Sequence, residues 1–79
     1  MPLSIILNGQ TRSFEDMHQP ALDQLIVRLD LKSDRIAVER NGQIVPRATW
    51  SQTRIHEGDK LEVVHFVGGG TSINAVQYT

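Results

Sequence analysis

Apolar side chains dominate the first stretch of the chain, Leu3–Leu7, and this stretch ends at Asn8-Gly9. Asn-Gly is the dipeptide that best fits the two positive-φ positions of a type I′ hairpin turn. The residues that follow, 10–14, alternate small hydroxyl side chains with larger ones before an acidic pair. The pattern therefore predicts a hairpin whose second strand is short and lies at an edge of the sheet.

A helical pattern follows this hairpin. Leu22, Leu25, Ile26 and Leu29 recur at the i, i+3, i+4 and i+7 spacing that places side chains on one face of a helix. Pro20 is expected at the first helical position, where its missing N–H leaves no extra group unpaired. The pattern predicts one amphipathic helix of at most about three turns that covers a sheet.

A second hairpin is predicted around Asn41-Gly42, between an alternating strand over residues 35–40 and a short return over residues 43–45. Pro46 has no N–H to give to a ladder, so the chain should leave the sheet there. The segment after it is expected to be irregular, with Trp50 filling part of the core.

The strongest strand pattern, Lys60–Val67, comes late in the chain and carries Val and Leu on both faces. We expect this strand at the centre of the sheet, parallel to the first strand through a right-handed crossover. The order of elements predicts an α+β fold, with one main helix packed on one mixed sheet. The chain would then divide into a domain over residues 1–67, a glycine arm over 68–70 and a flexible extension over 71–79.

Composition narrows the function classes. The 79 residues suffice for one domain, and their formal net charge of −1 comes from scattered charges, which argues against nucleic acid as a partner. No apolar run reaches the roughly 20 residues that span a bilayer, so we expect no membrane contact and a cytoplasmic location. The chain has no cysteine, and its three histidines lack the spacing of a metal site. A carrier or binding module is favoured over an enzyme.

Three motifs stand out along the chain. They are Ile36–Gly42, Ile44-Val45-Pro46-Arg47 followed by Trp50, and Glu57–Gly70, which ends in Val-Val-His-Phe-Val-Gly-Gly-Gly. Together they resemble the thiamine-biosynthesis sulfur carrier (ThiS) family. The resemblance covers essentially Met1 to Gly70, and the joint occurrence of the proline-arginine turn and the glycine-ended strand is more specific than a glycine pair alone.

The resemblance implies a ubiquitin-like β-grasp fold and a mechanism. In such proteins the carboxylate of the last glycine is adenylated by a ubiquitin-activating-enzyme-like adenylyltransferase that uses ATP and magnesium, and it is then converted to a thiocarboxylate. Thiazole synthase takes the sulfur. The carrier itself binds no cofactor or metal and catalyses nothing. Here the resemblance assigns the sulfur to Gly70, with Gly69 and Gly68 as a delivery arm.

The extension over residues 71–79 departs from this family pattern. The carboxyl group of Gly70 is tied up in the amide to Thr71, so it could not be adenylated in the chain as written. A protease that removes the extension is the favoured explanation; residues added during cloning and a divergent carrier that never matures are the others. Cleavage after Gly69 would also leave a Gly-Gly end.

A docking surface for the activating enzyme is the remaining hypothesis. Alternation along the last strand puts Val64 and Phe66 opposite the face that contains Val63, so they could form an apolar patch beside the glycine arm; equally, both faces could be buried. Arg47 could contact an acidic partner or simply be solvated. The alternative functions are a ubiquitin-like modifier and a noncovalent β-grasp adaptor.

Overall fold

The sheet is built around its last long strand. The computed structural model describes residues 2–66 and the backbone of residues 76–78, and its strand order is β2-β1-β5-β3-β4, with β6 also paired to β5. β1 and β5 are parallel, whereas all the other strand pairs are antiparallel. The predicted central position and direction of β5 are therefore confirmed. The strands are β1 (Leu3–Leu7), β2 (Gln10–Phe14), β3 (Ile36–Arg40), β4 (Gln43–Ile44), β5 (Lys60–Phe66) and β6 (Val76–Tyr78).

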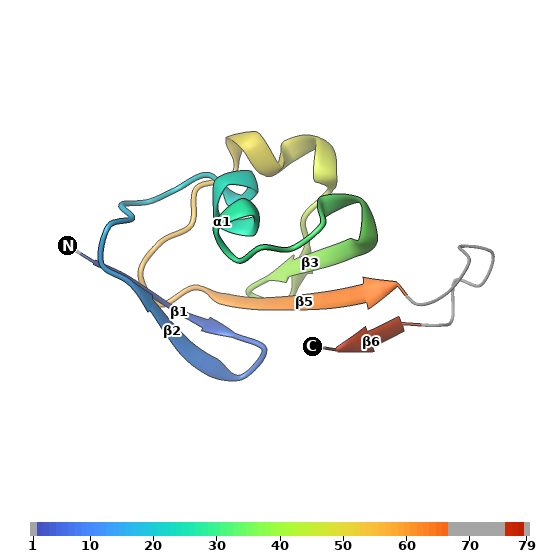
Figure 1. Ribbon diagram of the computed structural model, residues 1–79, viewed down its shortest axis with the longest axis horizontal. Helices are drawn as coiled ribbons and strands as arrows, with labels where there is room; N and C mark the ends of the chain where they lie inside the picture. The colour runs from blue at the N-terminus through green and yellow to red at the C-terminus, as the bar shows by residue number, and fades with distance from the viewer. Residues whose placement is uncertain (1, 67–75, 79) are drawn as a thin grey trace.

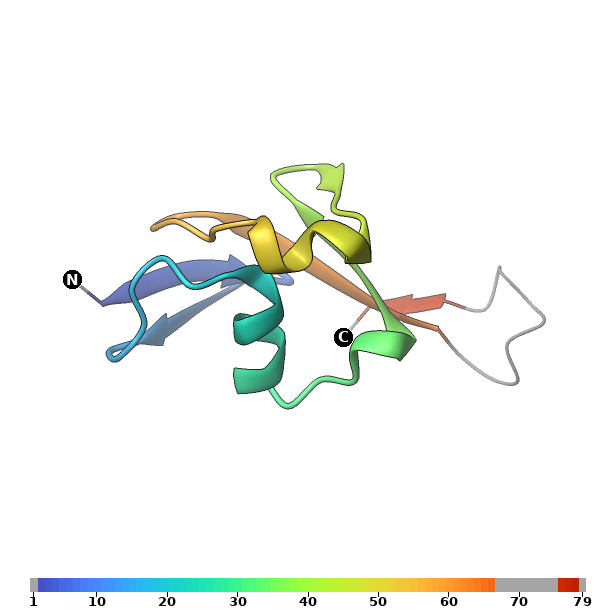
Figure 2. The ribbon, with the colours of Figure 1, turned by 90° about the horizontal axis from the view of Figure 1, so that it is seen from above.

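Helices cover one face of this sheet. The main helix α1 (Leu22–Arg28) lies across β5 and β3, and η2 (Arg47–Gln52) lies beside α1 on the same side (Figures 1 and 2). A short turn of 3₁₀ helix, η1 (Ser33–Arg35), leads into β3. The expected α+β fold is confirmed. The segment after Pro46, which was expected to be irregular, is the 3₁₀ helix η2.

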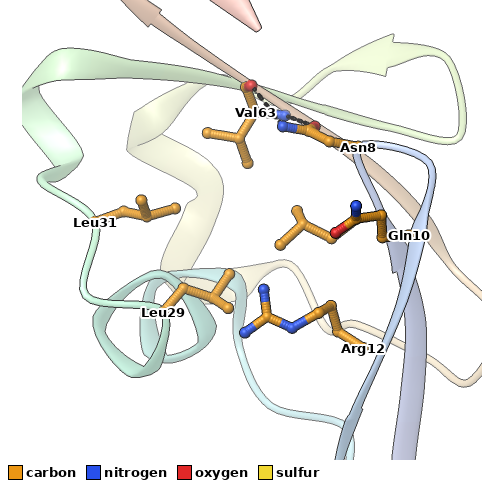
Figure 3. A pocket seen from close by; sticks show the side chains of 7 residues that line it. Asn8, Gln10, Arg12, Leu29, Leu31 and Val63 are labelled. Atoms are coloured by element: carbon orange, nitrogen blue, oxygen red, sulfur yellow. Dashed lines mark hydrogen bonds between the residues drawn. The ribbon is translucent and has the colours of Figure 1, made fainter. Parts of the chain in front are cut away.

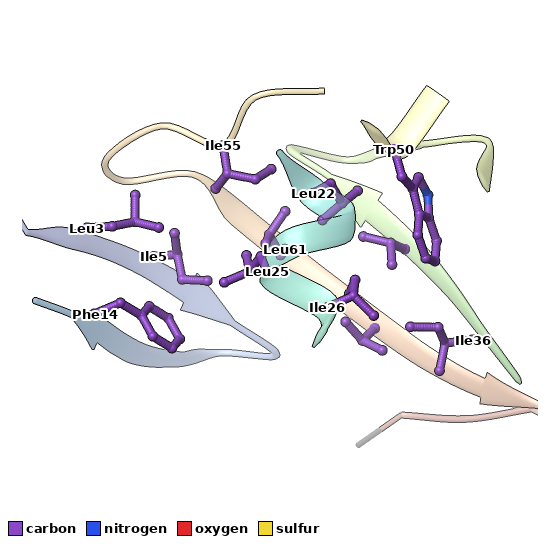
Figure 4. Close-up of a cluster of buried hydrophobic side chains, with 12 residues drawn as sticks. Leu3, Ile5, Phe14, Leu22, Leu25, Ile26, Ile36, Trp50, Ile55 and Leu61 are labelled. Carbon is purple, nitrogen blue, oxygen red and sulfur yellow. The ribbon is translucent and has the colours of Figure 1, made fainter. Parts of the chain in front are cut away.

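The core lies between the inner face of the sheet and the helices (Figure 4). Trp50, a residue of η2, closes the end of this core; it is 3% exposed and its Nε1–H donates to the Val45 carbonyl at 2.9 Å. Its predicted core role is therefore confirmed. The buried apolar cluster consists of Leu3, Ile5, Phe14, Leu22, Leu25, Ile26, Ile36, Val38, Trp50, Ile55, Leu61 and Val63.

Both Asn-Gly dipeptides form the predicted hairpin turns. Asn8 and Gly9 have φ values of 48° and 82°, and Asn41 and Gly42 have φ values of 52° and 87°. Two consecutive positive φ values define the type I′ geometry, whose twist matches that of the flanking strands. The register of β1 with β2 and of β3 with β4 follows from these turns.

The sequence pattern placed Pro20 at the first helical position. In the structure, Pro20 lies before the helix. Ala21 is the N-terminal cap of α1, and its N–H donates to the side chain of Gln24 at 3.2 Å. The carbonyl of Pro20 accepts a hydrogen bond from the Ile55 N–H at 2.9 Å. This contact with the segment before β5 holds Pro20 outside the helix. The preference of proline for the first helical position is a local rule, and it takes no account of a contact with a distant residue.

The extension contains a strand that the sequence analysis did not predict. Residues 71–79 were expected to lack regular structure, yet Val76–Tyr78 forms β6 and pairs antiparallel with the end of β5 (Figure 1). Three residues are too short to give a periodic signal. The glycine arm over residues 68–70 lies outside the described residues, so its boundaries stay predictions.

Candidate docking site at the end of the central strand

The two faces of β5 differ sharply in exposure. Leu61 and Val63 are each 1% exposed and point into the core, whereas Phe66 is 49% exposed. Val64 is half-buried and shares the outer face with Phe66 because side chains alternate along a strand. The outer orientation of both residues was one of the two alternatives, and the other, a strand buried on both faces, is wrong for Phe66.

Apolar residues gather on this outer face, where none of the described helices lies (Figure 1). Ala37 is the β3 partner of Val64, and Ile44 of β4 follows in the next row, 63% exposed. We call Ala37, Ile44, Val64 and Phe66 the outer patch. The outer patch is exposed apolar surface on the sheet, next to the point where β5 ends. Such a surface is typical of a protein-binding site.

Two carboxylates border the outer patch, and the sequence analysis missed them. Glu39 of β3 and Glu62 of β5 are directly opposite each other in the antiparallel ladder. Among the described residues, neither forms an ion pair. Like charges placed directly opposite across a sheet are destabilising, so a basic group from a partner would be favoured at this position. Only the register reveals this pair, because the two residues are far apart in sequence.

Arg47 is not part of the outer patch. It belongs to η2 on the helix side of the sheet, and its guanidinium lies over the Trp50 ring at 5.9 Å from the centroid. Such a contact is a weak cation–π attraction at an exposed site. The structure therefore separates Arg47 from Val64 and Phe66, and a single flat partner surface would not contact all three.

A polar cluster fixes the start of β5. Asp59, 8% exposed, accepts hydrogen bonds from the His56 N–H at 2.8 Å, from Arg40 Nε at 2.9 Å and from Asn41 Nδ2 at 3.2 Å. Burial alone would raise the pKa of Asp59, but these donors outweigh it and hold the pKa below its usual range. The cluster joins the second hairpin to β5 and sets which β5 residues face inward.

The side chain of Asn8 pairs with the backbone of β5 further along (Figure 3). Its Oδ1 accepts from the Val63 N–H at 2.7 Å, and its Nδ2 donates to the Val63 carbonyl at 3.2 Å. This contact adjoins an open cavity of about 290 Å³ that is lined also by Leu29, Leu31 and Arg12. The cavity is on the helix side, away from the outer patch.

Two kinds of feature, metal-binding clusters and membrane-spanning helices, are absent from the part of the chain that the structure describes. No group of three or more His, Cys, Asp or Glu residues there could hold a metal ion. No helix within residues 2–66 is long and apolar enough to cross a membrane.

A five-strand mixed path with a parallel β1–β5 pair, one helix across it and a glycine run just after the central strand defines a ubiquitin-like β-grasp domain. The sequence model of the ThiS family matches residues 5–70. The chain therefore belongs to the ThiS family, the family of the sulfur carriers in thiamine biosynthesis.

Individual relatives agree with this assignment. The crystal structure of the thiamine biosynthesis protein ThiS from Geobacter metallireducens superposes with a TM-score of 0.77 at 25% identity, covering 86% of this chain and 100% of that one. The sulfur carrier protein ThiS of Bacillus subtilis is 33% identical over 49 residues, which are 62% of this chain and 74% of that protein.

Larger proteins are also similar. A thiazole synthase of Paramagnetospirillum magneticum is 38% identical over 69 residues, and one of Magnetococcus marinus is 38% identical over 68 residues. These segments are 87% and 86% of this chain but only 21% and 20% of the two synthases. The chain thus spans about a fifth of the length of these relatives.

Proposed function

We propose that this protein carries sulfur as a thiocarboxylate on Gly70 and donates it for thiazole formation in thiamine biosynthesis. The single observation that carries the proposal is that the ThiS family match extends to residue 70 and so includes the whole glycine run. The carrier acts in the cytoplasm as a co-substrate and, like other sulfur carriers of its family, is not itself the catalyst.

Activation of the glycine carboxylate is the first chemical step. A carboxylate is a poor acyl donor until one oxygen becomes a good leaving group, and an acyl-adenylate made from ATP provides this. The carboxylate displaces pyrophosphate from ATP to form this adenylate; hydrosulfide then attacks the carbonyl carbon, AMP leaves, and the thiocarboxylate remains on Gly70. ATP and magnesium belong to a ubiquitin-activating-enzyme-like adenylyltransferase, and the carrier supplies the carboxylate. Because the chain has no cysteine, its own side chains hold no competing thiol.

Processing must come before activation. Gly70 is followed by Thr71, so a protease has to release the Gly70 carboxylate before adenylation. Gly68 and Gly69 suit the delivery arm because residues without Cβ can enter a narrow cleft in many backbone conformations. Thiazole synthase is the acceptor we propose, and this is supported by the two proteins of that name that contain a similar segment.

The outer patch serves as the docking surface for the adenylyltransferase in this proposal. Phe66 is its most prominent anchor, because a half-exposed aromatic side chain near the centre of an interface is a typical source of binding free energy. Glu39 and Glu62 would receive basic side chains of the enzyme at the rim. Arg47 lies on the helix side of the sheet, so it would contact a different surface of the adenylyltransferase or bind the thiazole synthase instead.

The test is the intact mass of the chain in its native host, with and without thiamine starvation. We expect a species that ends at Gly70 and has one oxygen replaced by sulfur. Gly69→Val is the matched variant, since its processed form should fold but fail to enter the enzyme cleft and should keep its oxygen. If the full chain alone appears under every condition, the carrier function is wrong and a noncovalent adaptor takes its place. Isopeptide products through Gly70 would instead show a modifier.

A further inference from the structure

The two edges of β5 are paired in different ways. Along one edge, β3 pairs with β5 continuously from Leu61 to His65. Along the other, β1 pairs with Lys60 and Leu61 alone, and β6 pairs with residues 64–66. The second edge is therefore assembled from separate pieces, and its last piece comes from the C-terminal extension.

A side chain separates these pieces. Asn8 follows the last residue of β1, and its amide group pairs with both the N–H and the carbonyl of Val63 (Figure 3). The side chain thus replaces a strand residue at this point, and β1 does not continue along β5. Beyond Val63 the edge is available to another strand.

The N–H and carbonyl that β6 pairs with at this edge are those of His65. Successive residues of a strand direct their N–H and carbonyl groups to alternate edges. Since those of Val63 face Asn8, those of His65 face the same edge, and His65 is the residue that the register pairs with Gln77 of β6. Removal of β6 would leave this donor and this acceptor without their ladder partner.

We propose that the edge of β5 at residues 64–66 is a strand-docking site. In the processed chain it takes an extended, antiparallel segment of the adenylyltransferase that acts on Gly70. The inference rests on the proposed function, because cleavage after Gly70 removes β6. An unpaired strand edge is a template for another chain, and addition of a strand is a common way of binding one. Here β6 shows that this edge accepts a strand.

The register also defines the chemistry of the partner segment. Val76 is paired with Phe66, Gln77 with His65, and Tyr78 with Val64. The sequence of β6 is therefore apolar, polar and apolar in order. A partner segment with this pattern would place apolar residues opposite the two β5 members of the outer patch, where cross-strand apolar pairs add to the backbone hydrogen bonds.

Amide hydrogen exchange, measured by NMR, tests this inference at one residue. Three samples are compared: the full chain, a chain that ends at Gly70, and the shortened chain with the adenylyltransferase of the same organism and ATP. The matched control is the Val64 amide, which faces β3 by the same alternation and is paired with Ala37. All the described residues of the buried apolar cluster come before Gly70, so the shortened chain keeps them and we expect it to fold; a protected Val64 amide would demonstrate it.

We expect His65 exchange to be slow in the full chain, about tenfold or more faster in the shortened chain, and slow again in the complex. The Val64 amide should stay protected throughout. Fast His65 exchange in the full chain would overturn the inference, as would fast exchange in the complex. Protection of His65 in the shortened chain that grows with concentration would also overturn it, because a second copy would then be the occupant.

Adenylation, measured in the same mixture by ATP–pyrophosphate exchange, separates the two proposals. Activity with an exposed His65 amide leaves the sulfur-carrier function standing and removes the docking edge. If neither activity nor a complex is found, both proposals are wrong.

A second experiment compares two variants of the shortened chain. His65→Pro removes the N–H at this edge while His65→Ala keeps it, and proline is tolerated where no ladder partner is needed. With Val64 still protected, we expect the proline variant to bind about tenfold more weakly than the alanine variant; equal affinity would contradict the inference.

Discussion

Val63 and Val64 are neighbours of the same residue type in the same strand, yet they belong to different surfaces. Val63 is 1% exposed and packs among the buried residues beneath α1. Val64 lies on the outer face and is half-buried beside Phe66. In a central strand of a small sheet, stability and recognition therefore alternate from residue to residue, and single substitutions should separate them.

The largest expected effect breaks the inner face. Val63→Ala should lower the free energy of unfolding by about 2 kcal/mol, because two methyl groups leave the core and a cavity remains. Val64→Ala should lower it by less than about 1 kcal/mol, since the site can fill with water. Urea denaturation of the two variants measures both values, and equal losses would contradict the division of the two faces.

The second prediction concerns recognition on the outer face. Phe66→Ser should leave the urea midpoint nearly unchanged while the affinity of the processed chain for the adenylyltransferase falls about tenfold, since an aromatic anchor is lost. Val27→Ser is the matched control, because Val27 is 77% exposed on α1, away from the outer patch. Titration calorimetry on both variants gives the affinities. Equal weakening by the two serines would mean that the outer patch has no special role.

The third prediction tests the start of β5, which decides which valine faces inward. At neutral pH, Asp59→Asn should cost about 1 kcal/mol of stability because the ionised form accepts three hydrogen bonds. The folded-state pKa of Asp59 is lowered, so its stabilisation is complete above the unfolded value of about 3.9 and is lost as the pH falls through the folded value.

The difference between wild type and Asp59→Asn should therefore shrink below about pH 4. Urea denaturation across this pH range measures it. A difference that stays constant down to the lowest pH would show that the carboxylate charge does not hold the start of β5.

The smallest expected effect sharpens the description of the outer face. Glu62→Gln removes one of two opposed carboxylates and should raise stability by a few tenths of a kcal/mol, less so in high salt. Glu15→Gln, an exposed change away from the sheet face, is the control: it should change neither the stability nor its dependence on salt. The same Glu62 change should weaken partner binding if basic side chains meet this rim. Unchanged stability at low salt would show that the two charges do not interact.

Local sequence rules predicted the turns, the main helix and the central strand. Asn-Gly dipeptides require two positive φ values, and both occur where expected. The spacing from Leu22 to Leu29 identified the apolar face of α1, and the run before the glycines identified β5. The sequence could not decide whether Val64 and Phe66 are exposed or buried, because an apolar strand can be buried on one face or on both. The structure was needed to choose between the two alternatives.

The side-chain contacts of Asn8 and Asp59, which sequence reasoning missed, join residues far apart in the chain. Asn8 was assigned a turn role alone, yet its side chain contacts Val63, 55 residues away. Asp59 entered the sequence analysis only within the Glu57–Gly70 motif, although its hydrogen-bond partners include Arg40, 19 residues earlier. Such contacts follow from the strand order, and no local pattern carries them. The assignment of the glycine arm came from family resemblance and not from local physics.

The Asn-Gly turns also bear on how the molecule ages. Asparagine followed by glycine is prone to deamidation, because the small glycine lets its backbone nitrogen attack the side-chain amide. In the fold, the amide of Asn8 is bound to Val63, and that of Asn41 is bound to Asp59 and to the Lys60 N–H. Both side chains are thus held in place by β5 or by the residue just before it. We expect slow deamidation in the native protein and faster loss in urea, which peptide mass mapping over time would show, so the same hydrogen bonds that order the sheet also set its chemical lifetime.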